Sequence, residues 1–173
     1  MENQANSKNI ILNYGLYLGG ASILIALIKY ASGMQYKQEF ISGIAGFIAL
    51  VAFIILGIKK YKSNNNGLVS FGKALKVGLG ITLIATLVII VYYAIFAFVI
   101  EPNFMDNTIE MQKVVWADSF GMTPEQIEKS EEQSRKFFFL SLFGGVFIMN
   151  MFLGGVTSLI AGAIMKKTEE EQY

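Results

Sequence analysis

Two residue types that carry much of protein chemistry are missing from this 173-residue chain, which contains no cysteine and no histidine. Without cysteine there is no disulfide scaffold, no thiol nucleophile and no thiolate metal site. Without histidine the chain also lacks the commonest general base and the commonest metal ligand. Charged residues are scarce, at 16% against roughly 25% in soluble proteins, and their net charge is only +1. We therefore expect no metal, no cofactor and no nucleic-acid partner.

Charge is almost absent from four long apolar segments, which predict an all-α integral membrane protein. The segments cover residues 10–28, 41–58, 75–100 and 137–165. In the third, no charge occurs from Val77 to Ile100, a run of roughly 36 Å as a helix, enough to cross a hydrocarbon core of roughly 30 Å. The first is longer than the apolar part of a signal peptide and no A-x-A-like motif follows it. We expect residues 1–173 to form one membrane domain, a four-helix bundle.

Residues 101–136 separate the third and fourth spans and predict a helical excursion from the membrane. Asn107 and Glu110 have the spacing of a capping box, which favours a short helix from Thr108 to Asp118, ended by Gly121. Thr123, with proline next and glutamine at the third helical position, predicts a second helix start. No helix breaker follows it, so residues 124–165 should form one helix, or two joined by a mild bend near residues 135–137. Three acid-before-base pairs four residues apart support its start: Glu125/Lys129, Glu131/Arg135 and Glu132/Lys136.

The distribution of basic residues favours both termini in the cytoplasm. Cytoplasmic termini would place eight of the 14 Lys and Arg residues inside: Lys8, Lys59, Lys60, Lys62, Lys73, Lys76, Lys166 and Lys167. The other six would lie outside: Lys29, Lys37, Lys113, Lys129, Arg135 and Lys136. The link from Lys59 to Lys76 lies close to two span ends, where the positive-inside rule applies. Its five lysines are candidates for lipid-headgroup contacts, although ordinary topology signalling is the favoured interpretation: Lys59, Lys60, Lys62, Lys73 and Lys76.

Small residues at four-residue spacing predict close helix packing. In the fourth span these are Asn150, Gly154, Ser158 and Gly162, and in the first they are Gly15 and Gly19. Such stripes let another backbone approach closely, and we expect the two faces to pack together, within one chain or across a dimer. A polar residue at mid-span such as Asn150 is a functional-site candidate, but an interhelical hydrogen bond is the simpler interpretation.

Several short segments resemble one bacterial family. They are SFGKALKVG from Ser70, the pattern Ile100-x-Pro102-x-Phe104, and GMTPEQIE from Gly121 to Glu128. The chain is similar in these segments to the family known as domain of unknown function 4199. That resemblance implies a small four-span inner-membrane protein, from a family found mostly in Bacteroidota. It implies no reaction and no functional residues; Glu101 stands where aspartate is expected in many members.

These features favour a non-enzymatic protein of the bacterial inner membrane. No carboxylate, lysine or arginine lies in the apolar core of any predicted span, which argues against a proton-coupled carrier or an intramembrane aspartyl protease. We expect a protein that acts by helix packing and partner binding in the cell envelope. Its partners would be the lipid bilayer and either another protein or a second copy of the chain. The alternative is a small-solute transporter or channel component, with Asn150, Thr82 and Thr86 along its path. A membrane-surface enzyme acting on lipid-linked substrates is the least favoured interpretation.

Overall fold

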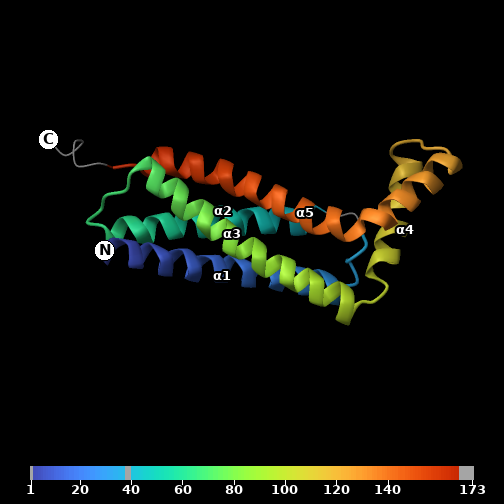
Figure 1. Ribbon diagram of the computed structural model, residues 1–173, viewed down its shortest axis with the longest axis horizontal. Helices are drawn as coiled ribbons and strands as arrows, with labels where there is room; N and C mark the ends of the chain where they lie inside the picture. Colours follow the sequence, from blue (N-terminus) through green and yellow to red (C-terminus); the bar gives the residue numbers. More distant parts are fainter. Residues whose placement is uncertain (1, 38–39, 168–173) are drawn as a thin grey trace.

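Four long helices form an elongated bundle, and a helical hairpin lies across one of its ends (Figure 1). The computed structural model describes residues 2–37 and 40–167. Its elements are α1 (Glu2–Ala31), α2 (Ile41–Asn64), α3 (Phe71–Ile95) with its π-helical continuation η1 (Phe96–Ile100), α4 (Phe104–Asp118) and α5 (Pro124–Met165). The helices α1, α2, α3 with η1, and α5 are each long and apolar enough to span a membrane. The predicted all-α, four-span fold is therefore confirmed. We call the end where α1 begins and α5 ends the proximal end, and the other the hairpin end.

Helix α3 is the central element of the bundle, because α1 and α5 both pack against it and, among the described residues, do not contact each other. Its contact with α1 depends on glycine. A Cβ atom on Gly15 would lie 2.6 Å from Cβ of Ile84, and one on Gly19 would lie 2.7 Å from Cγ1 of Val88. Both contacts advance by four residues, because the two helices run in the same direction. The missing Cβ atom of each glycine lets a β-branched side chain of α3 reach the α1 backbone.

Helix α5 packs against another face of α3 through small residues on both helices. Gly154 lies opposite Thr82 and Ser158 opposite Gly78, and the next step brings Gly162 to Ala74. We call these six residues the α3–α5 seam. From one pair to the next, the residue number rises by four on α5 and falls by four on α3, as the antiparallel direction of the two helices requires. Extending the same register by one step places Thr86 opposite Asn150.

The proximal half of the bundle is tightly packed. Ile54 and Ile58 of α2 and Ile81 of α3 are fully buried, and Val77 and Ala74 complete the same cluster. At the proximal end the Lys62 ammonium donates a hydrogen bond of 2.8 Å to the Met165 carbonyl, which is one of the orphan acceptors at the end of α5. Val69 and Lys167 exchange two backbone hydrogen bonds of 2.9 Å. These contacts fasten the α2–α3 link to the end of α5.

The beginning of α4 differs from the prediction. The helix starts at Phe104, so Asn107 lies inside it and is not a cap; its amide donates to Glu101 over 3.4 Å. Tertiary packing explains the earlier start. Phe104 is buried between Phe96 and Phe138, with ring centroids 5.5 and 5.9 Å away. Burial of this ring outweighs the local preference of Asn107 for a cap.

Helix α5 is continuous from Pro124 to Met165, and it changes direction where it leaves the bundle (Figure 1). The predicted capping box is confirmed, because the Thr123 hydroxyl accepts from the Gln126 amide and the Gln126 side chain accepts from the Thr123 amide. Gly121, at φ +62°, lies in the turn that precedes it. We call α4 and the part of α5 that packs on it the hairpin.

Ion pairs hold the two arms of the hairpin together. Lys113 of α4 contacts Glu131 of α5 at 2.9 Å, and Asp106 of α4 pairs with Arg135. Glu131 and Arg135 also pair with each other at 3.0 Å, as their spacing predicts. For the other two predicted pairs on α5, the described residues show no ion pair. Lys113 and Arg135 thus each pair with a carboxylate on their own helix and with one on the other arm.

Candidate functional site

A half-open cavity lies between the helices in the hairpin half of the bundle. It has two adjoining chambers, of about 290 and 190 Å³, and all four spanning helices contribute to its walls. The chambers adjoin because six residues line both of them: Ser22, Ser42, Gly43, Gly46, Ile89 and Asn150. Asn150, singled out as the polar residue at mid-span, therefore lies at the junction of the two chambers.

The cavity exists because α2 loses contact with its neighbours along its first turns. Added Cβ atoms on Gly43 and Gly46 would meet no atom within 4 Å. Further along the same helix, a Cβ atom on Gly57 would clash with the Ile81 side chain. Glycine therefore brings α2 onto α3 in the proximal half and leaves space in the hairpin half.

Three polar side chains of the cavity donate hydrogen bonds to carbonyls of their own helices. Ser22 donates to the Leu18 carbonyl and Asn150 to the Val146 carbonyl, both at 2.9 Å. Thr82, in the deeper chamber, donates to the Gly78 carbonyl at 3.0 Å. Each of these bonds leaves the oxygen of the side chain with acceptor capacity. The cavity thus offers hydrogen-bond acceptors to a molecule that carries donors.

The cavity is polar at one end and apolar at the other. Lys29 and Gln35, beside Tyr92 and Tyr93, line the wider chamber near the hairpin end. The deeper chamber adds aliphatic and aromatic side chains: Leu18, Phe47, Leu50, Ala85 and Leu153. Beyond it the bundle is closed by the buried isoleucines of the proximal half. No carboxylate lines either chamber among the described residues.

Comparison with known proteins identifies the family but not an activity. A family model described as a protein of unknown function, DUF4199, matches residues 13–167. The chain belongs to the DUF4199 family. No curated protein and no solved structure matches it. The resemblance inferred from the sequence is confirmed at the level of the family, while the bacterial group expected for it stays a prediction.

In this DUF4199 protein the predicted small-residue faces lie apart. Gly15 and Gly19 pack on one face of α3, whereas Gly154, Ser158 and Gly162 pack on another. Among the described residues α1 and α5 do not contact each other, so the expected pairing of their faces within one chain is wrong. The physical reason is that α3 lies between them and presents glycine or small residues to both. Both faces are therefore already buried inside one chain.

The other predicted residues divide between the cavity, the interior and the surface. Thr82 lines the deeper chamber, whereas Thr86 lines neither and is buried, with no hydrogen-bond partner for its hydroxyl among the described residues. Lys62 binds the end of α5, and the Lys73 ammonium lies 5.7 Å from the centre of the Tyr61 ring. Three further lysines of the link are exposed, and their contact with lipid headgroups stays a prediction: Lys59, Lys60 and Lys76.

The sequence reasoning missed Ser22, Ser42, Gly43 and Gly46 as site residues. Their signal was a cluster of small residues early in the second span, Ser42-Gly43-x-x-Gly46, facing a serine in the first. Small residues of this kind usually mark close packing in membranes. They line a cavity here because no other helix in the described part of the chain packs closely against them.

Proposed function

We propose that this DUF4199 protein is a non-enzymatic receptor for a small amphiphilic solute, which enters the bundle from the extracytoplasmic side. The observation that carries the proposal is the position of half-buried Asn150 at the junction of two chambers between the helices. Polar side chains at membrane depth are costly and usually serve a purpose. Here Ser22, Ser42 and Asn150 from three different helices meet at the same place.

The walls define the class of the solute. Hydroxyl and amide oxygens at the junction suit a group with O–H or N–H donors, and the leucines of the deeper chamber suit an apolar tail. The absence of carboxylates from the described walls gives no attraction for a cation, and Lys29 lines the wider chamber without reaching the junction. We therefore expect an uncharged polar group at the junction, on a short apolar body.

Catalysis has little support at this site. A nucleophile needs a neighbouring base, and the chain has neither histidine nor cysteine. The serines and Asn150 lie among aliphatic side chains, with Lys29 the only charged residue in the described walls. Binding without chemical change is the function that these groups can perform.

Transport has weaker support than binding. Ile54, Ile58 and Ile81 line neither chamber, and a path to the proximal end would have to pass these fully buried side chains. It would also run beside the α3–α5 seam, where backbones touch and little side-chain movement is available. The expectation of a protein partner loses its original basis as well, because both small-residue faces are buried on α3.

Single-cysteine labelling tests access to the cavity, and the cysteine-free chain provides a clean background. Asn150→Cys should react in intact cells with a membrane-impermeant maleimide, and Lys129→Cys, at an exposed position of the hairpin, should do so as a positive control. Ile54→Cys, fully buried in the proximal half, should stay unlabelled. Labelling of Asn150→Cys no faster than that of Ile54→Cys would contradict a cavity open to the outside, and protection of Lys129→Cys would contradict the orientation.

Native mass spectrometry tests the bound solute itself. Protein purified from its own membranes in mild detergent should carry a small molecule. Gly46→Leu would fill the cavity, and the solute should be lost from this variant. Gly145→Leu is the matched control, since Gly145 is exposed and an added Cβ there meets no atom within 4 Å. Equal occupancy in both variants, or an empty wild-type protein, would contradict the proposal.

A further inference from the structure

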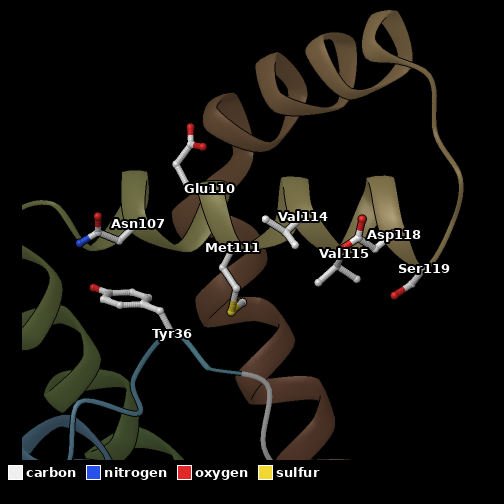
Figure 2. Close-up of a pocket in the computed structure, with 8 residues that line it drawn as sticks. All are labelled: Tyr36, Asn107, Glu110, Met111, Val114, Val115, Asp118 and Ser119. Carbon is white, nitrogen blue, oxygen red and sulfur yellow. The ribbon is translucent and has the colours of Figure 1, made fainter.

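A second hollow, separate from the cavity in the bundle, lies beneath α4. It has a volume of about 770 Å³ and lies between this helix and the link from α1 to α2 (Figure 2). Eight residues line it: Tyr36, Asn107, Glu110, Met111, Val114, Val115, Asp118 and Ser119. We call it the α4 recess. It does not depend on the solute proposed for the bundle.

The position of the recess matches the surface of a bilayer that surrounds the spans. Helix α4 crosses the end of the bundle instead of continuing its axis (Figure 1). Met111 and Val115 point from α4 towards the side of Tyr36 and the bundle, whereas Glu110 points away (Figure 2). A helix at the end of membrane spans, with apolar residues on the side of the bilayer, has the arrangement of an interfacial helix.

The apolar surface of the recess continues the lipid-facing surface of the spans. Phe98, Val99 and Ile100 are exposed at the end of η1, and only residues 101–103 separate them from α4. Val114 in the recess is 59% exposed. On the other side of the hairpin, the single tryptophan, Trp116, shares a shallow hollow with Phe137 and with Leu140, which is 72% exposed. Both sides of the hairpin thus extend the apolar belt of the bundle.

The charge of the recess selects among lipid headgroups. Two carboxylates, of Glu110 and Asp118, line it, and no lysine or arginine does so among the described residues. Glu110 points away from the side of Tyr36 and is paired with Lys113 at 3.0 Å, whereas Asp118 has no ion pair among the described residues. The Asp118 carboxylate at the rim of an apolar hollow attracts a cationic group and repels an anionic headgroup.

We propose that the α4 recess binds a phospholipid with an ammonium headgroup from the adjacent membrane leaflet. Its acyl chain lies along Met111, Val114 and Val115, and its ammonium lies at Asp118 on the rim. The lipid fills the space under the helix and holds the hairpin on the membrane surface. Continuity with the lipid-facing belt and the sign of the rim charge favour a lipid over a second protein.

Tryptophan fluorescence tests the position of the hairpin. The full-length protein is reconstituted into phosphatidylcholine bilayers with bromine at a shallow or a deep acyl position. Trp116 emission should be quenched, and more strongly by the shallow label. Emission that neither label quenches would place the hairpin away from the membrane and overturn the proposal.

Retention of lipid tests the recess itself. The protein is extracted from bilayers of equal phosphatidylethanolamine and phosphatidylglycerol, and bound lipids are counted by native mass spectrometry. Asp118→Asn should lower retention of the ethanolamine lipid roughly fivefold, the effect of about one charge near a membrane surface. Glu128→Gln removes one exposed carboxylate of the same hairpin outside the recess and should change nothing. Equal loss in both variants, preferential retention of the glycerol lipid, or a lipid-free dimer that covers the recess would each overturn the proposal.

Discussion

Adjacent glycines of α5 allow a sharp test of the α3–α5 seam. Gly154 faces α3, and an added Cβ atom would lie 2.5 Å from Cγ2 and 2.8 Å from Cβ of Thr82. Gly155 is the next residue, where an added Cβ atom would lie 3.7 Å from the Leu79 side chain, an ordinary contact. We predict that Gly154→Ala destabilises the protein and that Gly155→Ala does not.

The magnitude follows from two opposing terms. Alanine gains about 0.5–1 kcal/mol over glycine inside a helix, and this term is similar at both positions. At Gly154 the added methyl must also separate two helices or move Thr82, whose hydroxyl is bonded to the Gly78 carbonyl. Overpacking of this kind costs about 1–3 kcal/mol. The two variants should therefore differ by about 1–3 kcal/mol in the free energy of unfolding, with Gly155→Ala at or above the wild type.

Reversible unfolding by dodecyl sulfate in mixed micelles, followed by circular dichroism, measures this difference. The comparison is sound because both substitutions add the same atoms to the same helix, one residue apart. If Gly154→Ala were as stable as Gly155→Ala, the two helices would not be in close contact there, and the central position of α3 would be wrong.

Further predictions concern the hairpin, and the rate of backbone amide hydrogen exchange in α4 measures its opening. Hydrogen bonds from Lys113 and Arg135 hold the pKa of Glu131, on the part of α5 outside the membrane, below its ordinary value. Its contribution to hairpin stability should therefore be present above pH 4.5 and be lost as the pH falls through the lowered pKa; exchange that does not accelerate in this range would contradict the pairing. Phe104→Ala should destabilise the hairpin by about 3–5 kcal/mol, because the ring is buried; α4 exchange at the wild-type rate would show that the aromatic contacts do not hold it. Thr123→Ala should cost about 1 kcal/mol through loss of the cap and accelerate exchange in the first turn of α5, whereas Thr123→Ser should leave it unchanged.

The spans could be predicted from the sequence because a long uncharged run needs no partner to be recognised. The partners of each span could not be predicted. The stripe of Gly154, Ser158 and Gly162 shows a face that packs closely, but Gly15 and Gly19 of α1 fit it as well as Gly78 of α3 does. In soluble proteins a buried face is also apolar, whereas here apolar side chains cover every face and only residue size distinguishes one from another.

The cavity could not be predicted for a related reason. Gly43 and Gly46 are the same residue type as Gly57, and all three lie on α2. Gly57 brings its helix against Ile81, whereas the other two leave open space. The difference depends on what lies opposite each glycine, and this is set by the divergence of α2 from its neighbours. Asn150 could be selected because a polar side chain at mid-span is rare enough to stand out alone.

Substitution of Thr86 tests whether the polar residues near Asn150 serve helix packing or ligand binding. Its hydroxyl is buried and has no hydrogen-bond partner among the described residues, whereas the Thr82 hydroxyl one turn earlier is bonded to a carbonyl. Valine has nearly the same shape as threonine without the hydroxyl. Replacing an unpaired buried hydroxyl removes its desolvation cost, about 1–3 kcal/mol in proteins generally, and average hydrogen bonds in membranes suggest the lower end.

Thr86→Val should therefore leave the protein as stable as the wild type or stabilise it by about 1 kcal/mol, whereas Thr82→Val should destabilise it. Unfolding in mixed micelles gives both values. A loss of stability in Thr86→Val would mean that its hydroxyl is bonded through a water molecule, and the register of the seam makes Asn150 the nearest candidate for the other side of that bridge. The polar junction of the cavity would then extend into the seam itself, and Asn150 would serve packing as well as binding.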